Sequence, residues 1–245
     1  MTVANAKGMM ISGMIFDAGT TDSPVLLQVG SGHARSDNDA SDPSGLYDVF
    51  FRIGGAEPGR ATSSLVVNSN NVILDDIWAW RADHGTGVGW TSNTANTGLI
   101  VNGDNVIAYG LFVEHYQQYE VIWNGNGGTD IFFQNELPYD PPSQSDWMAS
   151  PTQDGYPAWL VTPNVTTFHG YGMGSYIVFI STPAALTDAE AFQSPNTPGV
   201  QFQNVFALWI AGSGGGFTSV INGVGGPVNS TTDPGHAPVD VAIYP

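Results

Sequence analysis

The sequence predicts an all-β protein, a single-stranded right-handed parallel β-helix of about seven rungs with long loops at one corner. A Gly, Asp, Asn or His recurs seven times between short, mostly apolar β-prone runs, at spacings of 35, 28, 34, 25, 34 and 35 residues. These residue types accept positive φ most readily, and one such bend per turn with variable loops is typical of stacked β-coils. The predicted bends are Gly13, Asp48, Asp76, Gly110, Asn135, His169 and Asn204.

A second pattern follows each bend. The second residue after the bend is apolar in every row, which predicts a ladder that faces the core, with neighbouring rungs about 4.8 Å apart. This ladder consists of Ile15, Phe50, Trp78, Phe112, Leu137, Tyr171 and Phe206. The fourth residue after the bend is polar or aromatic in the first five rows, so we expect it to face a ligand. These five residues are Asp17, Arg52, Trp80, Glu114 and Tyr139.

The strand that precedes two of the bends repeats as well. Residues 65–68 and 99–102 read Leu-Val-Val-Asn and Leu-Ile-Val-Asn, 34 residues apart. Their final residues, Asn68 and Asn102, are expected to align with Asn124 in a ladder of side-chain amides. Such a ladder is predicted to be structural, because amides hydrogen-bond from one rung to the next.

The segments between the rungs are expected to be loops. Residues 19–44, 82–96, 140–156 and 174–198 are rich in Gly, Pro, Asn and Ser, so residues 1–245 are predicted to form one β-helix domain with walls of loops. Only residues 184–192 have a helical composition, with Thr187 as the cap. The chain starts almost directly on a rung, which predicts that the domain lacks rungs at its N-terminal end.

Composition restricts the function. A net charge of −17 repels phosphate backbones and polyuronates, so nucleic acid and pectin-type substrates are not expected. No apolar run approaches the roughly 18 residues of a membrane helix. The chain has no cysteine, and with few Lys and many Asn and Thr residues it resembles a secreted or cell-surface bacterial protein. No cofactor is expected; Ca²⁺ bound between loops as a structural support is an alternative.

The candidate chemistry lies after the third, fourth and fifth bends. The reactive side chains there are Trp80, Arg81, Asp83, Glu114, His115, Tyr139 and Asp140. The expected register stacks Trp80, Glu114 and Tyr139 in one column. It stacks Arg81, His115 and Asp140 in the next.

The carboxyl groups in this cluster suit glycoside hydrolysis. That reaction needs two carboxyl groups about 5–5.5 Å apart for retention or roughly 6.5–9.5 Å apart for inversion, and side chains on neighbouring rungs reach both ranges. We predict that Glu114 acts with Asp140 or Asp83 as the acid and the base or nucleophile. The adjacent Asp75 and Asp76 are expected to face outward and to occupy a bend, respectively.

The other cluster residues are predicted to bind the substrate. Trp80, Tyr139 and Trp90 would stack on sugar rings. Arg81 would bind hydroxyl groups or orient a carboxylate, and His115 would contact the substrate. The alternative is that Arg81, Glu114 and Asp140 form an ion-pair ladder on the surface and that the aromatic side chains pack under loops.

Several segments resemble a family of large secreted bacterial proteins with a pectin-lyase-like right-handed β-helix, whose members often carry labels such as adenylyl cyclase or coagulation factor 5/8 type domain protein. The segments are 17–19, 48–52, 80–85, 89–91, 101–105, 113–116, 123–127, 134–136 and 138–142. Nothing in the sequence supports cyclase chemistry. The resemblance implies a glycan-active protein and a chain that corresponds to the C-terminal part of a longer member. The catalytic elements of polygalacturonases and polysaccharide lyases are incomplete.

Two functions remain open. The first is a glycoside hydrolase acting on a neutral polysaccharide. The second is a non-catalytic module that binds glycan or serves as a structural part of a bacterial surface assembly. In either case residues 9–16 would expose an unpaired strand edge, which predicts self-association, as a dimer or an end-to-end stack through the N-terminal rung, or pairing with an upstream segment.

Overall fold

Two long sheets form the molecule in the computed structural model, which describes residues 1–4, 7–31, 40–182, 185–232 and 236–245. The short-strand sheet has nine strands, in the order β1 (Thr2–Val3), β3 (Ser23–Val29), β5 (Ala61–Val67), β7 (Thr97–Val101), β9 (Val121–Trp123), β13 (Trp159–Val161), β15 (Leu186–Gln193), β17 (Gly215–Ile221) and β18 (Val228–Asn229). The long-strand sheet has eight, in the order β19 (Val239–Tyr244), β16 (Val200–Gly212), β14 (Phe168–Phe179), β10 (Gly128–Glu136), β8 (Ile107–Glu114), β6 (Val72–Arg81), β4 (Ser44–Ile53) and β2 (Met10–Asp17).

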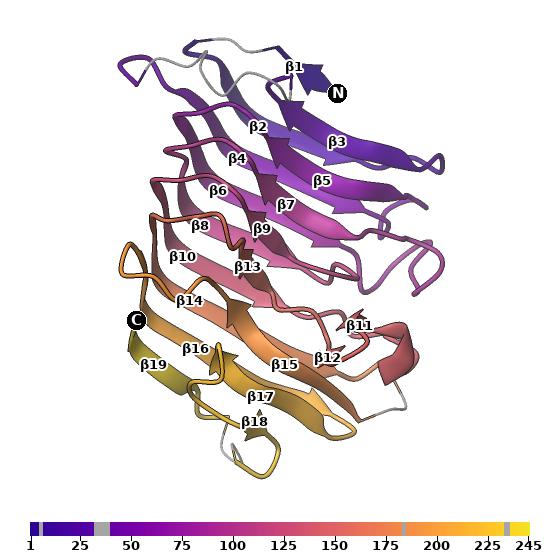
Figure 1. Cartoon of the computed structure of the whole chain (residues 1–245). Helices are drawn as coiled ribbons and strands as arrows, with labels where there is room; N and C mark the ends of the chain where they lie inside the picture. The colour runs from indigo at the N-terminus through magenta and orange to yellow at the C-terminus, as the bar shows by residue number, and fades with distance from the viewer. Residues whose placement is uncertain (5–6, 32–39, 183–184, 233–235) are drawn as a thin grey trace.

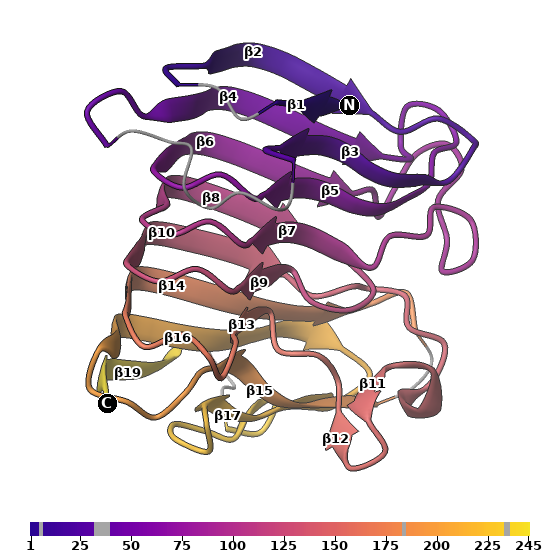
Figure 2. The same cartoon turned by 45° about the horizontal axis from the view of Figure 1, so that its top comes forward.

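The chain passes from one sheet to the other in turn, so each sheet grows by one strand per coil (Figure 1). Pairing is parallel from β2 to β16 and from β1 to β17, while β19 and β18 close the C-terminal ends antiparallel. Figure 2 shows both stacks running from the N-terminal strands to the C-terminal ones. The all-β architecture with parallel sheets is confirmed. One β-helix of about seven rungs stays a prediction.

Five of the seven predicted bends are confirmed and two are wrong. Gly13, Asp48, Asp76, Gly110 and Asn204 have φ between 52° and 62°. In the other two rows the left-handed residues are Phe132 (φ 72°) and Gly172 (φ 62°) instead of Asn135 and His169. The pairing of Phe133 with Leu111 and with Met173 requires these positions, so contacts with the neighbouring strands outweighed the local preference of Asn.

The predicted inward ladder is wrong in six of its seven rows. Leu137 is buried as predicted, but the other six residues are exposed or half-buried on the outer face. Trp78 is 43% exposed and Ile15 is 58% exposed. The left-handed residue interrupts the strand's alternation, so the residue directly after the bend is the one that enters the core. That buried column contains Val49, Ile77, Leu111, Phe133, Met173 and Val205. The second and fourth positions after the bend share the outer face.

The predicted helix at residues 184–192 is a strand over its described part. Strand β15 pairs in parallel with β13 and β17, and Leu186 and Phe192 are buried. Thr187 caps nothing; its backbone N–H donates to Gln144 Oε1 at 2.7 Å. Sheet pairing therefore overrides the helical propensity of the alanines.

The predicted amide ladder is confirmed. Asn102 Nδ2 donates to Asn68 Oδ1, and Asn124 Nδ2 donates to Asn102 Oδ1, each at 2.7 Å. Asn68 Nδ2 in turn donates to the Gly30 carbonyl at 3.2 Å. These bonds connect the ends of successive short strands, so the amide ladder is structural. The candidate site lies on the other, long-strand sheet.

The predicted loop at residues 82–96 contains no strand of either sheet. The loop prediction is wrong for residues 19–44, which contain β3, and for residues 174–198, which contain the end of β14 and all of β15. Residues 140–156 contain a 3₁₀ turn at Gln144–Asp146 and the small hairpin of β11 (Met148–Ser150) and β12 (Gln153–Asp154). Within the described residues, no helix is long and apolar enough to cross a membrane.

Candidate functional site

The outer face of the long-strand sheet carries a strip of stacked aromatic rings. Phe50 and Trp78 occupy the second position after their bends, and Trp80 occupies the fourth. The ring of Trp78 lies 4.7 Å from Phe50 and 6.1 Å from Trp80, centroid to centroid. Flat, half-exposed rings of this kind suit the apolar faces of sugars.

Two hollows share Trp78 and Asp76 as lining. The larger has a volume of 540 Å³ and is also lined by Ile77, Phe112, Glu114 and Gln134. The smaller, of 370 Å³, extends toward β2 over Gly13, Met14, Ile15, Asp48, Val49 and Phe50. A carboxyl group therefore borders the larger hollow directly.

A second glutamate joins Glu114 because the bend of its strand lies at Phe132. Gln134 pairs with Phe112, so Glu136, two residues further, lies opposite Glu114 on the neighbouring strand. Adjacent strands are about 4.8 Å apart. Sequence reasoning missed Glu136, since a bulky residue such as Phe132 rarely adopts positive φ and gave no signal for the bend.

Burial makes Glu114 hard to ionise. Its Oε2 accepts a 2.9 Å hydrogen bond from Trp78 Nε1. Desolvation raises the pKa of Glu114, and nearby Glu136 and Asp83 add to the rise, while His115 and the Trp78 bond oppose it. At mildly acidic pH this environment favours the carboxylic acid form more than water does.

The environment of Glu136 has the opposite effect. Its Oε2 lies 3.3 Å from His115 Nε2 and accepts a hydrogen bond from the Tyr139 hydroxyl. The His115 bond, followed by the Tyr139 bond, lowers the pKa of Glu136 against the desolvation that raises it. The two neighbouring glutamates are thus biased toward opposite protonation states, as a general acid and a general base require.

Asp83 completes the group of acids. Its Oδ1 accepts from Trp80 Nε1 at 3.3 Å, and it lies 2.9 Å from His84 Nδ1 and 3.8 Å from His115 Nδ1. The predicted proximity of Asp83 to Trp80 and His115 is therefore present in the structure.

Asp140 neutralises a buried cation. Both of its oxygens accept hydrogen bonds from Arg81, at 2.9 and 3.0 Å, and Arg81 is 1% exposed. Arg81 also donates to the carbonyls of Asn93 and His115. Removing one partner of such a pair leaves a buried charge uncompensated, which makes the pair a structural tie.

The remaining predicted residues, Trp90 and Tyr139, lie near the Arg81–Asp140 ion pair. The Trp90 ring packs on the Arg81 guanidinium, 5.6 Å from ring centroid to Cζ. The Tyr139 ring lies 4.4 Å from the His115 ring. Tyr139 and Asp140 follow β10 and do not continue the two predicted columns, yet both contact the residues with which they were expected to cluster.

Known proteins resemble the chain over this whole region. Residues 1–136 match the family model of the LAM55 pectate lyase-like domain. The chain belongs to this family. The expected relationship to pectate-lyase-like, glycan-active proteins is therefore confirmed.

Among the relatives, the chain is 44% identical over 245 residues to an exo-β-1,3-glucanase of Streptomyces sp. strain SirexAA-E, covering 100% of the chain and 39% of that protein. It superposes on sacteLam55A from the same organism with a TM-score of 0.93 at 44% identity, covering 43% of that structure. A variant of sacteLam55A in complex with glucose gives the same TM-score at 43% identity and 43% coverage. The chain thus spans about two fifths of the length of these relatives.

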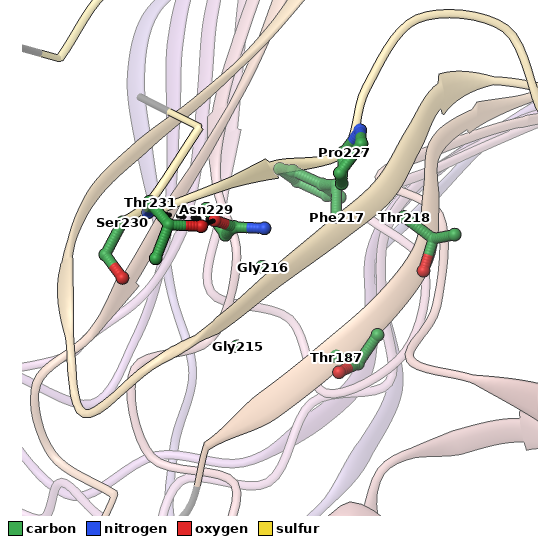
Figure 3. A pocket seen from close by; sticks show the side chains of 9 residues that line it. All are labelled: Thr187, Gly215, Gly216, Phe217, Thr218, Pro227, Asn229, Ser230 and Thr231. Carbon is green, nitrogen blue, oxygen red and sulfur yellow. Dashed lines mark hydrogen bonds between the residues drawn. The ribbon is translucent and has the colours of Figure 1, made fainter. Parts of the chain in front are cut away.

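Another hollow lies at the opposite end of the molecule, outside the residues that the LAM55 family model matches. It has a volume of 420 Å³ and lies between β15, β17 and the segment around β18 (Figure 3). Its lining consists of Thr187, Gly215, Gly216, Phe217, Thr218, Pro227, Asn229, Ser230 and Thr231. None of these side chains is an acid or base at neutral pH, so the hollow lacks the groups that hydrolysis requires.

Whether the protein can bind a metal ion depends on how its His, Asp and Glu side chains are grouped. In the part of the chain that the structure describes, no group of three or more His, Asp or Glu side chains is arranged to hold a metal ion. The carboxyl groups of the site are instead engaged by Trp78, His115, Tyr139 and Arg81.

Proposed function

We propose that this chain carries the acid–base pair of a glycoside hydrolase that removes glucose from the end of a neutral β-1,3-glucan. The observation that carries the proposal is the pairing of Glu114 and Glu136 on adjacent strands, with their pKa values shifted in opposite directions. The exo-β-1,3-glucanase and the glucose complex among the relatives support the substrate class.

Each group in the site has a distinct task in this proposal. One glutamate protonates the glycosidic oxygen, and the other accepts a proton from water or attacks the anomeric carbon. Trp78 and Trp80 stack on the glucan, and Asp83 keeps the field at the site negative, which stabilises an oxocarbenium-like transition state. Asp140 holds Arg81 in place and takes no part in proton transfer.

The charge of the protein supports a neutral substrate, and the size of that substrate supports an extracellular location. A net charge of −17 repels polyuronates but leaves uncharged glucans unaffected. Polysaccharides are also too large to cross a cell membrane unaided, so we propose that the protein is secreted or held at the cell surface.

Hydrolysis of laminari-oligosaccharides tests the proposal. We expect glucose to be the first product, released from one end of a reducing-end-labelled oligomer, as followed by chromatography. Xylan, mannan and polygalacturonate should yield no product. Saturable binding of the oligomer without release of glucose would reject catalysis and support the non-catalytic glycan-binding module.

We further propose that the chain associates through β2. In the described residues, β2 ends the long-strand sheet, and Met10, Met14 and Ile15 on it are 72%, 48% and 58% exposed. An unpaired strand edge with exposed apolar side chains is a template for another β-edge. The negative charge opposes this contact, so added salt should strengthen it.

Sedimentation velocity at low and high ionic strength measures this association. We expect the dimer fraction to rise with salt and to fall in Ile15→Lys. The control is Ile131→Lys, which makes the same charge change at a 41% exposed position within the sheet. A monomer at both ionic strengths would refute the association.

A further inference from the structure

His115 is a buried titratable group at the centre of the site, and its ring contacts the Glu136 carboxyl group. Its residue is 3% exposed and its backbone adopts φ 68°. Its ring lies against the Tyr139 ring on one side, so it cannot turn freely. Both ring nitrogens face oxygen atoms, which restricts where its protons can be.

The Nδ1 side of the ring requires a proton. Nδ1 lies 3.2 Å from the backbone carbonyl oxygen of Arg81, which can only accept a hydrogen bond. Asp83 Oδ1, at 3.8 Å from the same nitrogen, is also an acceptor. The tautomer that satisfies this side therefore carries its hydrogen on Nδ1.

One proton is then shared between His115 Nε2 and Glu136 Oε2. If Nε2 also carries a hydrogen, the ring is an imidazolium that donates to the Glu136 carboxylate. If it does not, Nε2 is an acceptor, and the 3.3 Å contact is favourable only when Glu136 Oε2 carries the hydrogen. Either way, one proton lies between Nε2 and Oε2.

Arg81 and Asp140 hold His115 in this position. Arg81 NH1 donates to the His115 carbonyl at 3.1 Å, and the Arg81 carbonyl faces His115 Nδ1. The Asp140 carboxylate fixes the same guanidinium through two bonds. The ion pair thus secures both the backbone and the ring orientation of His115.

We propose that His115 is a positioning residue for Glu136, with which it shares a single proton held between Nε2 and Oε2. The inference deepens the catalytic role proposed for Glu136. When that proton moves from Nε2 to Oε2, a neutral imidazole with hydrogen on Nδ1 and a carboxylic acid replace the imidazolium and the carboxylate. Glu136 can thereby gain or lose its proton without exchange with bulk water.

Charged and titratable groups surround this pair from three parts of the chain. Glu114 precedes His115 on β8, Asp83 and Arg81 approach from β6 and its following loop, and Tyr139 follows β10. Because the two sites share one proton, they should titrate as a coupled unit with common apparent pKa values.

NMR titration of the whole chain tests the inference without any need for activity. Glutamate labelled with ¹³C at Cδ and histidine labelled with ¹⁵N report the protonation of Glu136 and His115. We expect both probes in the unmodified protein to follow the same two apparent pKa values. Independent single-step titrations of the two residues would overturn the proposal, whether or not the chain hydrolyses glucan.

Two substitutions sharpen the result. In His115→Gln the amide keeps a hydrogen-bond donor but carries no proton to share, so the Glu136 titration should become a single step with a pKa higher by about one pH unit or more. The control His84→Gln removes a histidine that is 77% exposed and contacts Asp83, and it should leave the Glu136 curve unchanged. An unchanged Glu136 curve in a folded His115→Gln protein would also overturn the proposal. If His115→Gln does not fold, the two-probe comparison in the unmodified protein decides.

Discussion

Glu136→Gln and Glu114→Gln should each reduce kcat for β-1,3-glucan hydrolysis by about 10²–10⁴-fold, which is the range that general acid–base catalysis contributes. The amide keeps the size of the side chain and its hydrogen bonds to Trp78 or to His115 and Tyr139, but it cannot exchange a proton. KM should change little, because the aromatic strip is left intact. Steady-state release of glucose measures both quantities.

A control and a second substrate make this result specific. Asp75→Asn removes a carboxylate from β6, which is next to the strand of Glu114, at a position outside the cluster, and should retain activity within about twofold. An aryl β-glucoside with a good leaving group needs little protonation, so it should restore the variant that lacks the acid but not the one that lacks the base. Near-normal activity of either glutamine variant on glucan would exclude that glutamate from the chemistry.

Asp130→Asn should increase the free energy of unfolding at neutral and alkaline pH. Asp130 is 0% exposed, and neither carboxyl oxygen has a hydrogen-bond partner among the described residues. Its neighbours in register are Ala108 and Gly170, which provide no polar side chain. Burial therefore raises the pKa of Asp130 well above its usual value.

The sign of the effect follows from proton linkage. Between the unfolded and the folded pKa, the native state binds the proton that the unfolded state has lost. The free energy of unfolding therefore falls as pH rises, by about 1.4 kcal/mol for each pH unit, until the folded pKa is passed. Asp130 makes no such pH-dependent contribution below about pH 3–4, where its carboxyl group is protonated in both the folded and the unfolded state.

Urea unfolding from pH 4 to pH 9 measures this contribution. The unfolding free energies of the unmodified chain and Asp130→Asn should be similar at pH 4 and should diverge as pH rises, with the variant more stable. Glu120 and Asp188 are also fully buried with raised pKa values, but their contributions cancel in the comparison of the two proteins. Parallel curves over the whole range would show that Asp130 is not the buried acid responsible.

Local residue preferences were sufficient to predict most of the bends and part of the strand register. Glycine, Asp and Asn adopt positive φ at little cost, and all five confirmed bends contain one of them. The Asn68, Asn102 and Asn124 ladder followed from a repeat of strand sequence and is confirmed. The cluster around Trp80, Glu114 and His115 was also visible, because these residues follow correctly predicted bends.

Only the tertiary structure decided the position of Glu136. The left-handed bend in its strand lies at Phe132, where the pairing of β10 with β8 and β14 compensates for a conformation that the side chain disfavours. A register error of three residues moved Glu136 out of the column of Glu114 and put Tyr139 in its place. The same long-range pairing made β15 a strand and placed Asp130 in the core. The amino-acid sequence by itself determined where the chain prefers to bend, since that preference is local. Which side chains meet across neighbouring strands depended on contacts between residues far apart in the chain, which no local pattern records.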